Sequence, residues 1–110
     1  MRYQPIVRNT DFARAYRRGK NYVSPFLVTY VVRRRSGGVR VGITTSKQIG
    51  GAVQRVRARR VIRAAYDAMG LDTAQNVDLV FVARTATPKV KTQKVEKAMR
   101  AHLTAAGLLG

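Results

Sequence analysis

The sequence has no cysteine among its 110 residues, which excludes disulfides, thiolate nucleophiles and cysteine metal sites. His102 is the single histidine, and the five acidic residues are scattered, with no close pair. Paired carboxylates or a histidine beside a nucleophile are what a protein metal site or acid–base catalysis requires. We therefore predict no catalytic residue and no metal ligand in this chain, and a structural or exposed His102.

Long apolar runs are also missing. No stretch of about 18 apolar residues occurs, and the start, Met-Arg-Tyr-Gln-Pro, lacks the apolar segment of a signal peptide. No internal repeat and no long linker divides the chain, whose 110 residues are a common size for one domain. We expect a single domain over residues 1–110, soluble and cytoplasmic, with no membrane-spanning segment.

Acidic residues are outnumbered by basic ones. The chain has 22 Lys and Arg against five Asp and Glu, a net charge of +17 and a pI near 11.7. Its hydrophobic fraction of 45% is nevertheless that of a folded protein. Such an excess of positive charge favours a polyanionic partner, of which nucleic acid is the commonest, followed by a membrane surface or an acidic protein.

Helices are predicted near both ends of the chain. Asn9 or Thr10 can cap a short helix that Gly19 ends. Thr92 can cap a last helix that extends to about Ala106. The core-facing stripe of this last helix consists of Val95, Met99, Leu103 and Ala106.

Strands are predicted between these helices. The region Tyr22–Val32 is interrupted at Ser24-Pro25, giving two strand signals with an irregularity between them. After a turn at residues 36–38, apolar residues alternate from Val39 to Ile43, which indicates an antiparallel hairpin with the preceding region. Asp78–Arg84 is almost continuously apolar, as expected for a central strand covered on both faces.

The order α-β-β-β-α-β-α predicts a two-layer α/β (α+β) sandwich with about four strands. The strand–helix–strand unit from Val39 to Arg84 indicates two roughly parallel strands. The general rule for such a crossover is a right-handed connection.

The helix predicted from Ala52 to Met69 carries most of the functional signal. On a helical wheel its apolar residues gather on one side, whereas Arg57, Arg59, Arg60 and Arg63 spread over an arc of roughly 160° on the other side. Val56 falls within the basic arc. No acid is interleaved to pair with these arginines, so polyanion binding is favoured over a solvated charged face. The arginines are Arg55, Arg57, Arg59, Arg60 and Arg63, and the apolar side holds Ala58, Val61, Ile62, Ala65, Met69 and, at its edge, Tyr66.

Two glycines, Gly50 and Gly51, follow Lys47 and precede this helix. They can let a phosphodiester approach the free N–H groups of the first turn, where the helix dipole favours an anion. A plain strand-to-helix turn explains the glycines equally well. The pattern of a nucleotide-binding P-loop is absent from the sequence.

Phe12, Tyr16 and Tyr30 are a second candidate site. Phe12 and Tyr16 share one face of the first helix, and Tyr30 lies on the adjacent predicted strand. Most aromatic residues at helical spacing belong to a core. The alternative is a stacking platform for unpaired bases beside the basic helix.

The central segment resembles the protein subunit of bacterial ribonuclease P. The signature of that family is Ser-Lys-Lys-x-Gly-Asn-Ala-Val-x-Arg-Asn-Arg-x-Lys-Arg-x-x-Arg, and residues 46–63 here are SKQIGGAVQRVRARRVIR. The resemblance extends to the aromatic and glycine positions of the first helix and to the DLVFVAR strand. It implies an accessory role beside a catalytic ribonuclease P RNA, whose Mg²⁺ ions carry out the hydrolysis that removes the 5′ leader from precursor tRNA. The partners that it implies are these two RNAs, with no membrane partner and no small-molecule substrate.

The resemblance also implies roles for individual residues. The basic residues would bind RNA, and a cleft between the arginine helix and the sheet would hold the single-stranded leader. The family's crossover is left-handed, and we adopt that hand here. By position, Lys47, Arg55, Arg57, Arg59, Arg60 and Arg63 match the basic sites, and Phe12, Tyr16, Tyr30 and Val56 match the leader cleft.

Departures from the family pattern alter details. Gly51 and Val56 replace asparagines, and Gln48 replaces a lysine. The valine side chain cannot hydrogen-bond a base or phosphate, so its leader contact would be van der Waals only. The alternative interpretation is a non-catalytic basic RNA-binding module, such as a ribosomal or RNA-chaperone protein. A sequence-specific DNA-binding protein is disfavoured, because no helix-turn-helix pair precedes the arginine helix.

Overall fold

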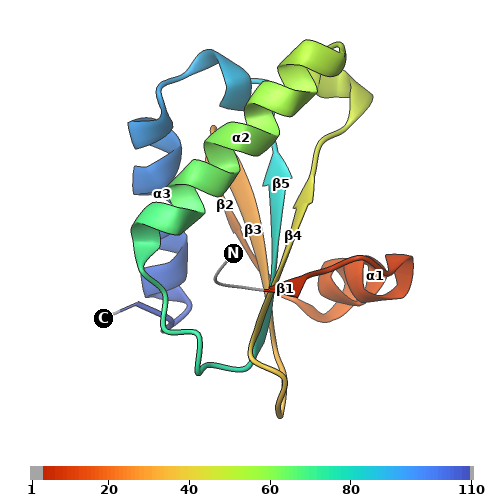
Figure 1. The fold of residues 1–110 in the computed structure, drawn as a ribbon, viewed down its shortest axis with the longest axis vertical. Coiled ribbons are helices and arrows are strands. Elements are labelled where there is room, and N and C mark those ends of the chain that lie inside the picture. Colours follow the sequence, from red (N-terminus) through yellow and green to blue (C-terminus); the bar gives the residue numbers. More distant parts are fainter. Residues whose placement is uncertain (1–3, 110) are drawn as a thin grey trace.

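The structure of the chain is a computed structural model that describes residues 4–109. Its strands form one mixed five-stranded sheet, and helices cover both faces of that sheet (Figure 1). Short 3₁₀ turns at Lys47–Ile49 and Thr87–Lys89 precede the second and third helices. The elements are β1 (Gln4–Pro5), α1 (Asn9–Arg18), β2 (Lys20–Val23), β3 (Leu27–Arg33), β4 (Val39–Thr44), α2 (Ala52–Met69), β5 (Val77–Ala83) and α3 (Thr92–Ala105).

The strand order is β1-β4-β5-β3-β2, which places β5 at the centre. β4 and β5 are parallel neighbours joined through α2, as predicted. β5 is antiparallel to β3 on its other side. The predicted antiparallel hairpin of β3 with β4 is therefore wrong, because β5 lies between these two strands. The antiparallel partner of β3 at the sheet edge is β2, and the break between them falls at the predicted Ser24-Pro25.

The alternating side chains of β5 serve two cores. Leu79 and Phe81 belong to the larger core under α2 and α3, whereas Val80 belongs to a smaller core with Ile6 and Ala15 under α1. All three of these β5 side chains are fully buried, which confirms a central strand covered on both faces. The sheet with α2 and α3 forms the predicted two-layer α/β arrangement, and α1 adds cover on the opposite face (Figure 1).

The predicted element order is confirmed, with one strand added. The short strand β1 pairs in parallel with β4 and makes the sheet five-stranded instead of about four-stranded. Because β1 is only two residues long, it has no alternating pattern from which it could be predicted. The left-handed crossover stays a prediction.

The ends of the helices differ in part from expectation. α2 begins at Ala52 and ends at Met69 as predicted, with Gly70 after it in the left-handed conformation that favours glycine. The predicted side-chain caps are wrong: α1 already includes Asn9 and Thr10, α3 already includes Thr92, and neither helix has a side-chain cap hydrogen bond. Backbone hydrogen bonds close the first turns instead, from Asp11 N–H to the Arg8 carbonyl and from Lys94 N–H to the Lys91 carbonyl.

Candidate nucleic-acid interface

Helix α2 separates an apolar face from a basic face. Ala58, Ile62 and Ala65 are fully buried in the larger core. On the opposite side Arg57, Arg59, Arg60 and Arg63 are exposed, and Arg55 is half-buried. The wheel is correct except that Val61 is only half-buried. The predicted basic arc is thus a solvent-facing surface of the folded protein.

The arginines of this surface have no acidic partner within residues 4–109. The ion pairs of that part of the chain all end on Asp11 or Asp78, which lie outside α2. Arg59 is oriented by the sheet, because its guanidinium donates to the carbonyl of Ile43 at 3.1 Å and to Thr45 Oγ1 at 3.5 Å. Unneutralised guanidinium groups on one face can bind phosphate bidentately.

A cleft of about 350 Å³ joins the basic helix to the first helix. Phe12 of α1 lines this cleft together with Arg59 and Arg63, which lie one helical turn apart on α2. Between them the edge of the sheet forms the floor. The residues that line this cleft are Pro5, Ile6, Phe12, Val41, Gly42, Ile43, Arg59 and Arg63.

Two further arginines of α2 border a different hollow. Arg57 and Arg60 lie beside the exposed side chains of Val53 and Val56 and, together with Ala52, line a hollow of about 430 Å³. Val53 is 79% exposed and Val56 is 47% exposed. The structure therefore does not bring Val56 into the cleft lined by Phe12, although the resemblance groups these two residues.

The tyrosines lie near the Phe12 cleft without lining it. Tyr16 is 45% exposed, and its ring meets the half-buried ring of Tyr30 edge-on at a centroid distance of 5.1 Å. Phe12 is half-buried against the small core of α1. The three aromatic side chains thus combine a packed side with an accessible side, as stacking residues need.

The turn before α2 uses its two glycines differently. Gly50 has φ +137°, a conformation that other residues rarely adopt, so backbone geometry explains it. Gly51 is extended, and a Cβ there would meet no atom within 4 Å. Its missing side chain leaves the N-terminus of α2 open, and Lys47 at the start of the turn is exposed. The phosphate-approach role of this turn stays a prediction.

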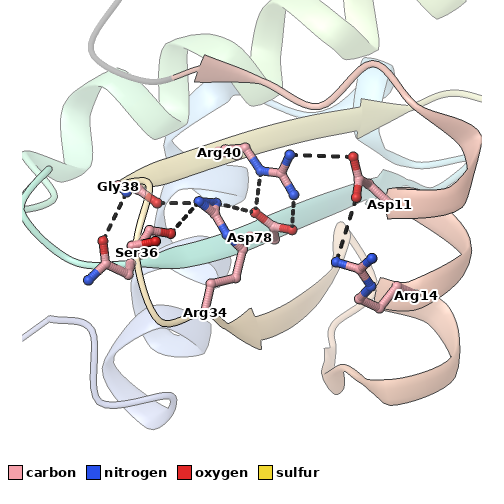
Figure 2. A network of polar contacts seen from close by, with 8 residues as sticks. Asp11, Arg14, Arg34, Ser36, Gly38, Arg40 and Asp78 are labelled. Carbon is pink, nitrogen blue, oxygen red and sulfur yellow. Dashed lines mark hydrogen bonds and ion pairs between the residues drawn. The ribbon is translucent and has the colours of Figure 1, made fainter.

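An arginine–aspartate network on the α1 side of the sheet was not predicted from the sequence (Figure 2). Asp78 is 1% exposed and accepts hydrogen bonds from Arg40 at 2.7 and 2.8 Å and from Arg34 at 2.9 Å. The bond to Asp78 raises the pKa of Arg40 above its ordinary value, against the opposing effect of burial. Arg40 also contacts Asp11 at 3.4 Å, and Asp11 pairs with Arg14 at 3.7 Å. Strand register, not a local motif, brings Arg40 beside Asp78.

His102 is buried, and its Nδ1 lies 2.8 Å from Thr29 Oγ1, at hydrogen-bond distance. Burial lowers the pKa of its imidazole. This placement fits the predicted structural role. Within residues 4–109, no three His, Asp or Glu side chains are grouped as metal ligands.

The fold and the cationic helix beside the cleft lined by Phe12 define an α/β protein of the nucleic-acid-binding class. In the described part of the chain, no helix is both long and apolar enough to cross a membrane. The family model for ribonuclease P matches residues 1–107. The chain therefore belongs to the ribonuclease P protein family, as the resemblance predicted.

Individual relatives agree with this assignment. The chain is 35% identical over 109 residues to the ribonuclease P protein component of Clostridium botulinum (strain Loch Maree / Type A3), covering 98% of both chains. It is 37% identical over 105 residues to that of Clostridium novyi (strain NT), covering 94% of this chain and 93% of the relative. Membership gives the chain a role in tRNA 5′ processing together with an RNA subunit.

Solved structures agree on the fold. The Staphylococcus aureus RNase P protein superposes with a TM-score of 0.81 at 25% identity, covering 96% of this chain and 97% of that chain. The RNase P protein from Thermotoga maritima matches in fold with a TM-score of 0.73, covering 87% of this chain and 91% of that one. The predicted fold class is thus confirmed by a known architecture.

Proposed function

We propose that this chain is the accessory subunit of a ribonuclease P whose RNA carries the catalysis. In this proposal the protein binds both the catalytic RNA and the single-stranded 5′ leader of precursor tRNA, in the cytoplasm. Mg²⁺ ions held by the RNA supply the hydrolytic chemistry. The described residues of the protein offer no carboxylate cluster for that ion, so the proposal assigns them binding roles only.

One observation carries the leader site: Phe12 and the two arginines Arg59 and Arg63 line the same cleft. An aromatic ring opposite two guanidinium groups can stack on an unpaired base while the cations meet the neighbouring phosphates. Arg59 donates to the carbonyl of Ile43, which lines the same cleft, so its guanidinium is held beside that cleft. A single RNA strand is the nucleic acid whose bases are free to stack in this way.

The second group of arginines suits the catalytic RNA. Arg57 and Arg60 project beside the exposed Val53 and Val56, in a hollow outside the Phe12 cleft. Structured RNA is recognised mainly through its backbone and shape, which suits cations beside apolar side chains that select no base. We therefore assign Arg59 and Arg63 to the leader, and Arg57 and Arg60 to the catalytic RNA.

Reconstitution with a bacterial ribonuclease P RNA tests the proposal. The protein should lower the Mg²⁺ concentration required to remove the leader, because its cations replace part of the ionic screening between RNA and substrate. It should also make the holoenzyme bind leader-bearing precursor tRNA more tightly than mature tRNA. Unchanged cleavage at low Mg²⁺, or equal affinity for the two tRNAs, would contradict it.

The assignment of the arginines has its own measurement. Arg63→Ala should reduce the preference for leader-bearing substrate, whereas Arg60→Ala should weaken binding to the RNA subunit alone. Each variant removes one positive charge from the same helix face, so each is the matched control for the other. Identical effects of the two variants in both assays would refute the division of roles.

A further inference from the structure

Helix α1 is fastened to strand β4 at two positions on one face of that strand. Arg40 and Gly42 are two residues apart, so both face α1. Arg40 Nη1 donates to Asp11 Oδ2 at 3.4 Å in the first turn of α1. The ring of Phe12, the next residue of the helix, lies over Gly42.

The contact at Gly42 leaves no space for a side chain. A Cβ at this position would lie 2.6 Å from Phe12 Cε1 and 2.7 Å from Phe12 Cζ. It would also lie 3.3 Å from Cβ of Ile6. Since ordinary carbon contacts are about 3.5–4.0 Å, any larger residue must displace the Phe12 ring. Gly42 has no positive φ, so contact with this ring, not backbone conformation, favours glycine here.

Asp78 holds the guanidinium of Arg40 in a fixed orientation. The guanidinium of Arg40 is bidentate on Asp78 of the central strand, and Arg34 from the β3–β4 connection shares the same carboxylate (Figure 2). Only 24% of the Arg40 side chain and 2% of the Asp78 side chain are exposed. A planar fork bound at two atoms has little freedom to rotate. The guanidinium that contacts Asp11 is therefore held at a fixed point above the sheet.

These two contacts determine where the Phe12 ring lies. One of the contacts holds the residue before it, and the other holds the ring itself. The same ring and Gly42 both border the cleft that contains Arg59 and Arg63. The distance across that cleft is thus set by how α1 sits on β4.

We propose that Arg40 and Gly42 are positioning residues for leader recognition. They hold the Phe12 ring at stacking distance from the RNA leader that Arg59 and Arg63 bind. This inference rests on the proposed function. It assigns no contact with RNA to Arg40 or Gly42 themselves. Their effect on the leader is transmitted through Phe12.

A double-mutant cycle in the reconstituted holoenzyme tests the inference. The quantity measured is the leader preference, defined as the ratio of the dissociation constants for mature tRNA and leader-bearing precursor tRNA. Phe12→Ala should reduce this ratio by about five- to hundredfold, the contribution of one stacked base. Gly42→Ala should reduce it by roughly three- to tenfold, a part of the same contribution.

The combined variant is decisive. In the Phe12→Ala background, Gly42→Ala should change the leader preference by less than about twofold, because the ring through which it acts is gone. Full additivity of the two losses would overturn the inference and leave the proposed function standing. A wild-type holoenzyme with no leader preference would instead overturn the proposed function, and the inference with it.

A second variant covers the case in which Gly42→Ala does not fold. Asp11→Asn uncouples α1 from Arg40 and should give the same loss, again abolished in the Phe12→Ala background. Glu96→Gln removes one negative charge on α3 and should leave the leader preference unchanged. Equal effects of Asp11→Asn and Glu96→Gln would mean that net charge alone is responsible, which overturns the inference.

Loss of stability is separated from positioning by Thr29→Val. This change removes the hydroxyl that contacts His102 beneath α3, on the sheet face away from α1. It should lower the melting temperature without reducing the leader preference. If destabilisation by Thr29→Val reduces the preference as much as Gly42→Ala does, the positioning role is refuted.

Discussion

Replacing Asp78 by asparagine should destabilise the fold more than any other neutralisation of an acid in the described chain. The carboxylate is 1% exposed and accepts three hydrogen bonds of 2.7 to 2.9 Å from two arginines. Asparagine preserves the shape but leaves the positive charges of Arg34 and Arg40 facing each other. Its amide group also directs N–H donors toward guanidinium donors.

The magnitude follows from burial. Removing one partner of a buried ion pair costs about 3–5 kcal/mol. The arginine side chains here are 17% and 24% exposed, so water partly screens the freed charges and we expect the lower end, about 3 kcal/mol. For a domain of this size each kcal/mol corresponds to about 4–8 °C, which gives a loss of about 12–24 °C in melting temperature.

Urea unfolding followed by circular dichroism measures this loss. With a slope of about 1–3 kcal/mol per molar, the midpoint should fall by about 1–3 M at an unchanged slope. Asp67→Asn is the charge-matched control, because Asp67 is exposed on α2 and its replacement raises the net charge equally. A midpoint for Asp78→Asn equal to that of Asp67→Asn would refute the reasoning.

Three further outcomes are expected. Because burial lowers the pKa of His102, the neutral imidazole stabilises the fold above pH 6.5, and thermal stability should fall as the pH drops from about 7 to 5. His102→Asn should flatten that decline. An equally steep decline in the variant would contradict the role given to His102. Replacing Arg59, Arg60 or Arg63 singly by alanine should lower the salt slope of RNA binding by about one unit or less, and an unchanged slope would mean that the arginine contacts no phosphate. Tyr16→Ala should weaken the binding of leader-bearing substrate by about 1–3 kcal/mol with little change in melting temperature. A loss of stability without an effect on leader binding would instead identify Tyr16 as a core residue.

The features predicted well are those with a local cause. The bounds of α2 follow from Gly51 and Gly70 on either side of an amphipathic pattern, and both ends agree with the structure. The apolar run of β5 predicted its burial because a strand covered on both faces needs no polar alternation. The basic face of α2 was equally visible, since the helical period alone separates it from the buried face.

The features that sequence reasoning missed depend on partners distant in the chain. No local pattern indicates that β5 inserts between β3 and β4, because these pairings join segments that are far apart in the sequence. The pairing of Arg40 with Asp78 follows from that insertion, so it was invisible too. The same holds for Val56, whose place on the wheel was right but whose neighbours are Arg57 and Arg60, not Phe12.

The insertion of β5 has a consequence for the order in which the chain can fold. Strands β3 and β4 are made before α2, yet each hydrogen-bonds β5, which is complete only at Ala83. Until then one edge of each strand lacks its partner, and the apolar face of α2 has no sheet to cover. Contacts between such distant segments slow folding and leave incomplete chains open to association with one another. A growing chain therefore displays the arginines of α2 on a stable surface only after its central strand has been synthesised.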